Sequence, residues 1–145
     1  MNITEHVQLR GILELAIMQQ NKIIEEYRDE NMIMNVAKDA LSRLIGGDGA
    51  GKVITQIGFG TNGAGPTPDD TALTGAFTKA LSGHTYPQPG HVKFTFSLAT
   101  TEANGMSIKE FGLICSDNTL FARKTRGAIE KADDISLEGS WTIIF

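Results

Sequence analysis

The sequence predicts a mainly β protein, an antiparallel β-sandwich with an N-terminal hairpin and one prominent α-helix at about residues 35–45. In the second half of the chain, apolar and polar residues alternate as they do along half-buried strands. Turn-forming pairs separate these stretches, and Asn104-Gly105 is a strong hairpin signal. We expect two inner sheet faces to bury Phe94, Phe96, Phe111, Leu113, Trp141 and Ile143.

Length and composition indicate one globular domain over residues 1–145. The chain has 145 residues, of which 41% are hydrophobic and 21% are charged. These values are typical of a folded domain that buries one core. No apolar run reaches the roughly 18 residues of a membrane helix, and no secretion signal is present, so we expect no membrane partner.

The charge of the chain argues against nucleic acid as a partner. Its formal net charge is −4, whereas binding to backbone phosphates needs a clustered positive surface. One basic cluster occurs, which we interpret as a solvated strand end and loop: Arg123, Lys124, Arg126 and Lys131. The single cysteine, Cys115, lies in an apolar run and is expected to be a buried, unreactive thiol.

Residues 7–30 fit two patterns. Several apolar residues have helical spacing, but Val7, Leu9, Leu13, Leu15 and Ile17 also share the parity of one strand face. A glycine inside this stretch weakens a helix, and a polar Gln-Gln-Asn-Lys segment can form a turn. We favour a hairpin over one long helix, although propensity alone leaves both open.

The predicted helix at residues 35–45 has one apolar stripe, and Gly46-Gly47 ends it. The stripe consists of Val36, Ala40, Leu41, Leu44 and Ile45. Asn31 or Asn35 is a candidate N-cap. A strand follows at residues 53–59, and residues 66–81 are compatible with one helical turn near Asp70.

Three further stretches complete the expected sheet. Residues 85–90, with two prolines and a glycine, form a loop. A change of parity around Lys109-Glu110 indicates a β-bulge, and Asp117-Asn118 indicates another turn. After a polar loop at residues 130–134, the last strand has Leu137, Gly139, Trp141, Ile143 and Phe145 on one face. We expect this strand to be built into the sheet.

Two glycine-rich strings between residues 46 and 73 resemble nucleotide-binding loops. The first, at residues 46–53, has Val53 where a phosphate loop needs Ser or Thr, and it follows a helix instead of preceding one. The second contains Gly58, Gly60 and Gly63, but the prolines after it forbid the helix that a dinucleotide site requires. We interpret the first string as a helix-to-strand connection. The second would end a strand that turns tightly under neighbouring backbone.

The remaining candidate site residues lack the spacing of a known chemistry. His6, His84 and His91 do not form a metal-ligand pattern with Cys115 or nearby acids. The pairs Asp69-Asp70 and Asp133-Asp134 lie in turn-like loops, where helix capping or solvation accounts for them. The sequence therefore predicts no catalytic, cofactor-binding or metal-binding residue and no enzyme activity.

Several short motifs, spread over nearly the whole chain, carry a family resemblance. In order they are N-M-I before the helix, I-G-F-G-T-N at a strand end, P-T-P-D-D-T-A-L, E-A-N-G, I-K-E-F-G-L, L-F-A-R and the closing W-T-I-I-F. Together they resemble small tail-fibre-like or baseplate-associated structural proteins encoded by tailed bacteriophages and prophages. These motifs are structural in character, so they specify a fold more closely than a role.

The resemblance implies a compact β-rich virion part that is made in the host bacterial cytoplasm and acts in the tail. It implies partners among other tail or baseplate proteins and a homo-oligomeric state. The residue patterns leave two alternatives open, a capsid decoration protein and a host-glycan-binding module, for which only Tyr86 is a suitable loop aromatic. The candidate contact surfaces are the loops at residues 61–70 and 83–90.

Overall fold

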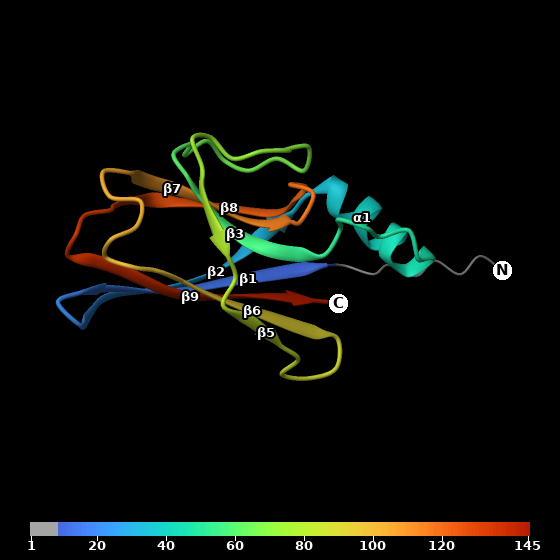
Figure 1. The fold of residues 1–145 in the computed structure, drawn as a ribbon, viewed down its shortest axis with the longest axis horizontal. Coiled ribbons are helices and arrows are strands. Elements are labelled where there is room, and N and C mark those ends of the chain that lie inside the picture. The colour runs from blue at the N-terminus through green and yellow to red at the C-terminus, as the bar shows by residue number, and fades with distance from the viewer. Residues whose placement is uncertain (1–8) are drawn as a thin grey trace.

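The computed structural model describes residues 9–145, which form a mainly β fold with one helix (Figure 1). Its elements are β1 (Arg10–Gln19), β2 (Lys22–Ile33), α1 (Asn35–Gly46), β3 (Ile54–Gly60), β4 (Phe77–Ala80), β5 (Gly83–Thr85), β6 (His91–Leu98), β7 (Ser107–Cys115), β8 (Leu120–Glu130) and β9 (Ile135–Ile144). The strands pair antiparallel in the order β4-β3-β7-β8-β2-β1-β9-β6-β5.

This sheet curls into a half-barrel, so its two halves face each other across the core (Figure 1). Strand β2 joins the halves on one side, because it pairs with β1 along most of its length and with β8 only at Met32 and Ile33. On the other side β4 pairs with β3, and the next strand, β5, pairs with β6. The predicted antiparallel β-sandwich is thus confirmed, and its layers are continuous through β2.

The N-terminal hairpin and the helix are confirmed. Gln20 and Asn21 join β1 to β2 with φ values of 52° and 63°, as a two-residue hairpin turn requires. The inward side chains of β1 are buried, namely Leu13, Leu15 and Ile17. Val7, which we assigned to the same face, lies outside the described residues.

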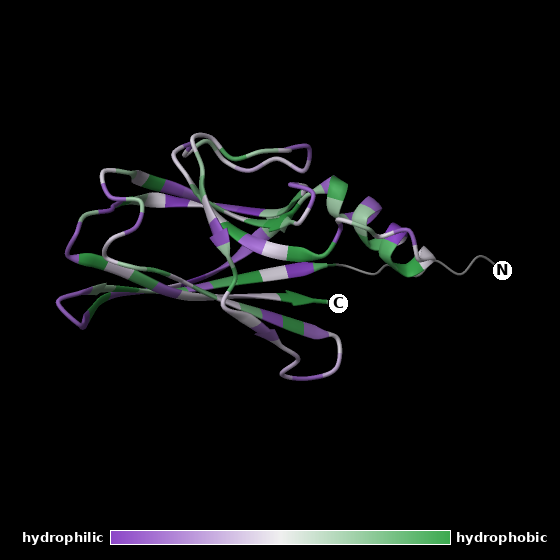
Figure 2. Ribbon diagram, in the orientation of Figure 1, coloured by the Kyte–Doolittle hydropathy of each residue, from purple (hydrophilic) through white to green (hydrophobic). Residues whose placement is uncertain are grey.

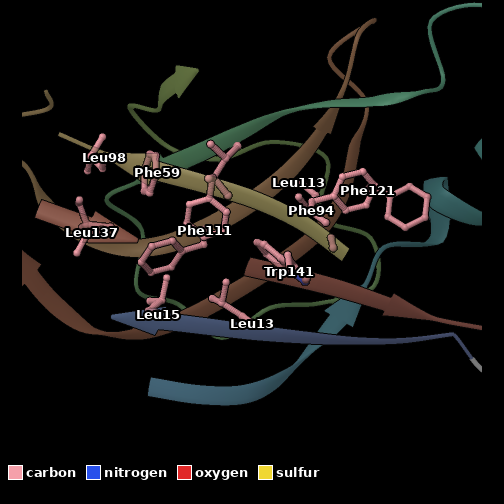
Figure 3. Close-up of a cluster of buried hydrophobic side chains, with 14 of the residues drawn as sticks. Leu13, Leu15, Phe59, Phe94, Leu98, Phe111, Leu113, Phe121, Leu137 and Trp141 are labelled. Atoms are coloured by element: carbon pink, nitrogen blue, oxygen red, sulfur yellow. The ribbon is translucent and has the colours of Figure 1, made fainter. Parts of the chain in front are cut away.

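The core fills the space between the two sheet halves (Figure 3). Phe59 packs edge-to-face against Phe96 and Phe111, with ring centroids 6.1 and 5.7 Å apart. Every residue predicted for the core is buried: Phe94, Phe96, Phe111, Leu113, Trp141 and Ile143. Alternating hydropathy along the strands is visible in Figure 2, which is the pattern that made this prediction possible.

Strand β9 lies between β1 and β6, so the last strand is built into the sheet as expected. The predicted bulge is also present, since the register of β7 against β8 shifts between Ile108 and Glu110. The Asp117-Asn118 turn joins β7 to β8, with Asn118 at φ 72°. The apolar pattern of β9, the parity change in β7 and the turn residues Asp117-Asn118 therefore predicted these features correctly.

The predicted hairpin at Asn104-Gly105 is wrong. Strand β6 pairs with β5 and β9, while β7 pairs with β3 and β8, so the chain crosses from one half of the sheet to the other here. The positive φ values belong to Ala103 (55°) and Gly105 (90°). Asn104 instead donates to the Thr100 carbonyl and accepts a hydrogen bond from Lys131, which closes the crossing loop.

Two smaller predictions are also wrong. Residues 66–81 contain no helical turn: Asp70 N–H bonds to the Thr67 carbonyl at 3.1 Å in a single turn, and β4 follows. The N-cap of α1 is Met34, without a side-chain capping bond. Asn31 instead lies in β2, where its Oδ1 accepts a hydrogen bond from the Trp141 indole at 2.7 Å.

Helix α1 packs on the sheet through small residues and ends at a glycine. Ala37 and Ala40 are buried, which allows the helix backbone to approach the strands closely. At its end Gly47 adopts φ 87°, and the amides of Gly47 and Asp48 bond to Leu44 and Arg43 in a Schellman arrangement. Within residues 9–145, no helix is long and apolar enough to span a membrane.

Candidate functional site

The loop at residues 61–76, between β3 and β4, is anchored by a buried charge network. Arg123 on β8 donates to Glu110 of β7 at 2.8 Å and to Asp70 of the loop at 2.9 Å. The side chains of Arg123 and Glu110 are 3% and 1% exposed, and that of Asp70 is 25% exposed. The loop is therefore held to the sheet by an ion pair that is shielded from water on the sheet side.

Backbone groups of the loop complete this network. The third Arg123 nitrogen, Nη2, donates to the carbonyls of Asn62 and Ala64, at 3.1 and 3.0 Å. Glu110 Oε2 accepts from the amides of Asn62 and Thr74, both at 2.9 Å. Because each buried side-chain nitrogen and oxygen of the network has a hydrogen-bond partner, the network fixes the path of an otherwise irregular segment.

The second glycine string makes room for these anchors. A Cβ added at Gly60 would lie 2.5 Å from the Glu110 carboxylate. One added at Gly58 would lie 2.7 Å from Leu73, a loop residue that packs against the buried cluster of Met34, Ile114 and Leu120. These two glycines therefore leave room for the side chains of Glu110 and Leu73, which hold the loop against the sheet. Our expectation of close neighbouring backbone at this string was wrong.

The interpretation of the basic cluster as solvated is also wrong. Arg123 and Lys131 are each only 2% exposed. Lys124 bonds to Asp29 at 2.8 Å, and Arg126 pairs with Glu25 and lies over the Tyr27 ring at 4.9 Å. The four cations are thus engaged by the protein's own acceptors, two of them across the gap where β2 and β8 diverge.

The two aspartate pairs differ in their roles. Asp70 belongs to the buried network, so capping or solvation does not describe it. Hydrogen bonds from the Thr67 amide and hydroxyl, and then the Arg123 guanidinium, lower the pKa of the Asp70 carboxyl. Its neighbour Asp69 accepts from Asn35 at 2.8 Å and so links the loop to the start of α1. Asp134 is in a turn, as expected, and accepts from Gln19 at 2.6 Å.

A second feature is an apolar pocket at the end of the half-barrel where α1, the β5–β6 turn and the C-terminus lie (Figure 1). Its volume is about 190 Å³. Its walls include Leu41, Ile54, Phe94, Phe121 and Ile143. Of the predicted apolar stripe of the helix, Leu44, which also lines the pocket, and Ile45 are exposed.

His84 and His91, the histidines within residues 9–145, lie apart from any metal-binding arrangement. His84 packs edge-to-face against Tyr86 at a centroid distance of 5.6 Å and lines the apolar pocket. His91 is hydrogen-bonded to Gln88 at 3.0 Å. In the part of the chain from residue 9 onward, no group of three or more His, Cys, Asp or Glu side chains could hold a metal ion. His6 lies outside the described residues.

The lysine of the first glycine string closes a turn. Lys52 Nζ donates to Asp117 at 2.6 Å and to the Thr119 hydroxyl at 3.2 Å, next to the β7–β8 turn. Gly47 ends α1 and the string leads into β3, as we expected. Hydrogen bonds from Lys52 and then from Thr119 lower the pKa of Asp117 from 3.8 to about 2.

Replacing Asp117 with asparagine is expected to make the melting temperature of the protein fall less steeply as the pH is lowered into the acid range. Because the folded-state pKa of Asp117 is depressed, its contribution is complete above about pH 4 and declines as the pH falls toward about 2. The melting temperature of the wild type should therefore fall more steeply over this window than that of Asp117→Asn. Circular dichroism melts at pH 2–7 measure this, with the exposed Asp48→Asn as control. Parallel profiles for wild type and Asp117→Asn would contradict it.

Cys115 is buried, as predicted, and burial raises the pKa of its thiol to about 11. Only the thiolate reacts, so native labelling by a maleimide at pH 7 should be slower than for a free cysteine by at least about 100-fold. Stopped-flow or mass-spectrometric labelling measures the rate. Denaturant should restore full reactivity, whereas rapid labelling of the native protein would show that this strand opens readily.

Sequence reasoning missed both features because neither has a local pattern. The network joins Arg123 to Glu110, 13 positions away, and to Asp70, 53 positions away. The pocket gathers residues from six elements and the C-terminus. One signal existed: the motifs of the family resemblance include Asp70, Glu110 and Arg123. Comparisons of the chain with models of protein families, with curated proteins and with solved structures gave no match.

Proposed function

We propose that this chain is a structural protein of a tailed-phage virion, in the tail fibre, the baseplate or the site of fibre attachment. It acts through protein–protein contacts, without an enzyme activity, as a homo-oligomer in contact with other tail proteins. It would be made in the host bacterial cytoplasm and then incorporated into the tail. This function rests on the residue motifs and on the geometry that they form.

One observation carries the proposal. Three of the resemblance motifs contribute Asp70, Glu110 and Arg123, and these residues meet in one network that holds an exposed loop to the sheet. Such an arrangement presents a fixed recognition surface on a rigid sheet, which suits an assembly protein. The buried titratable groups of the network are consumed by hydrogen bonds within the fold, so they support attachment rather than chemistry.

Mass spectrometry of purified virions, with heads and tails separated, tests this function. We expect the chain in the tail fraction of particles that encode it, and cryo-electron microscopy should place the loop at residues 61–76 against another protein. Recovery with heads would instead favour a capsid decoration protein. Tyr86, which is 73% exposed, makes glycan-array binding the corresponding test of a glycan-binding module. Absence of the chain from every particle fraction would contradict a virion role.

A further inference from the structure

Large apolar side chains gather at one end of the half-barrel, around the mouth of the apolar pocket. They come from the end of α1, the start of β3, the β5–β6 turn and the C-terminus (Figure 1). We call these five the apolar end: Leu44 (38% exposed), Ile45 (88%), Val53 (56%), Tyr86 (73%) and Phe145 (53%). Leu44, Val53, Tyr86 and Phe145 also line the pocket.

The area of the apolar end is large for an uncovered surface. At these exposed fractions, the five side chains present on the order of 600 Å² to solvent, the upper limit of the largest patch on a typical monomer. A standard-size interface buries about 800 Å² on each partner. The apolar end together with its polar rim therefore matches the area that one stable protein–protein contact requires.

The apolar end carries both a projecting side chain and a hollow. Ile45 is 88% exposed and lies one helical turn after Leu41, which lines the pocket of about 190 Å³ together with residues such as Phe121 and Ile143. A protruding side chain and a hollow on the same face are what a two-fold contact uses, because each copy then inserts its projection into the other. Both elements of such a contact are present here on one chain.

The one charged side chain that lines the pocket among the described residues, Lys52, does not oppose this contact. Lys52 is paired with Asp117 at 2.6 Å, so it adds little like-charge repulsion when two copies approach through this end. Most of the surface buried would be apolar, as in interfaces between identical subunits.

We propose that a second copy of this chain covers the apolar end, forming a two-fold dimer in which Ile45 of each copy occupies the pocket of the other. The dimer is the surface through which the homo-oligomer of the proposed function forms, and in that sense it rests on that function. It also explains why the apolar stripe of α1 extends past the residues that contact its own sheet.

Sedimentation velocity of the full chain between about 1 and 100 µM tests the dimer. We expect the wild type to dimerise and Ile45→Asp to weaken the dimer more than about 30-fold, because a carboxylate would be buried in an apolar pocket. The matched control is Ile23→Asp, which changes a residue of similar type, 54% exposed, at the start of β2 away from α1. It should leave the dimer unchanged. Near-ultraviolet circular dichroism checks that both variants fold.

Three results would overturn the proposal. A monomeric wild type at 100 µM would mean that another occupant covers the apolar end, such as residues 1–8 of the same chain or a different protein. An unchanged dimer in Ile45→Asp, or equal dissociation in Ile23→Asp, would place the contact elsewhere. Detection of the chain in virions depends on none of these results, so failure of the dimer and failure of the virion role are distinguishable.

Discussion

Glu110→Ala is expected to lower the free energy of unfolding by about 3–5 kcal/mol, because it removes one partner of a buried ion pair. Arg123 would keep Asp70, at 2.9 Å, and the loop carbonyls, but it would lose its fully buried counter-ion at 2.8 Å. The amides of Asn62 and Thr74 would lose their acceptor as well. Against a typical total stability of about 5–15 kcal/mol, this loss is large.

Urea unfolding measures this loss, and hydrogen exchange locates it. Protection should fall at the amides of Asn62 and Thr74, because Glu110 is their acceptor. The double variant Glu110→Ala/Arg123→Ala should lose less than the sum of the single variants, since it removes both members of the pair. Asp39→Ala, which breaks the exposed pair with Arg43, is the control and should cost below about 1 kcal/mol. Additive single effects would show that the network is not a unit.

Gly11→Ala is expected to destabilise the protein by about 1–3 kcal/mol, although a change from glycine to alanine usually favours a strand. Gly11 lies opposite Asn31 in the β1–β2 pairing, and an added Cβ would be 1.9 Å from the Asn31 Oδ1. That oxygen accepts the hydrogen bond of the fully buried Trp141. The methyl group would therefore displace Asn31 and leave the indole N–H unsatisfied.

A double-mutant cycle with Asn31→Ala separates this mechanism from a general effect on the strand. If the clash is responsible, Gly11→Ala should cost little in the Asn31→Ala background, because the three nearest atoms all belong to Asn31. Gly83→Ala in β5, where an added Cβ meets no atom within 4 Å, is the control and should be nearly neutral. An equal cost of Gly11→Ala in both backgrounds would exclude the clash.

The apolar stripe of α1 illustrates where sequence patterns stop being informative. Helical spacing predicted one face from Val36 to Ile45, and the helix indeed forms over these residues. The sheet, however, covers only the first turns, and the stripe continues beyond it to a residue that is 88% exposed. Periodicity reports which residues share a face, while the size and position of the neighbouring element decide how much of that face is buried. The apolar face of α1 is longer than the part that the sheet covers, and this difference is the observation that indicates an interface.

The sequence by itself determined most of the strands, the helix with its glycine end and the identity of the core, and it favoured the N-terminal hairpin over a long helix. These properties follow from alternation, helical spacing and the φ requirements of turns, all of which act between neighbouring residues. The tertiary structure alone decided that the chain crosses between sheet halves at Asn104-Gly105. It also decided that Arg123, in a segment that reads as solvated, is buried against Glu110. Strand partners and burial of a charge depend on contacts between residues far apart in the chain, and a local pattern carries no information on which distant residue will supply the counter-ion.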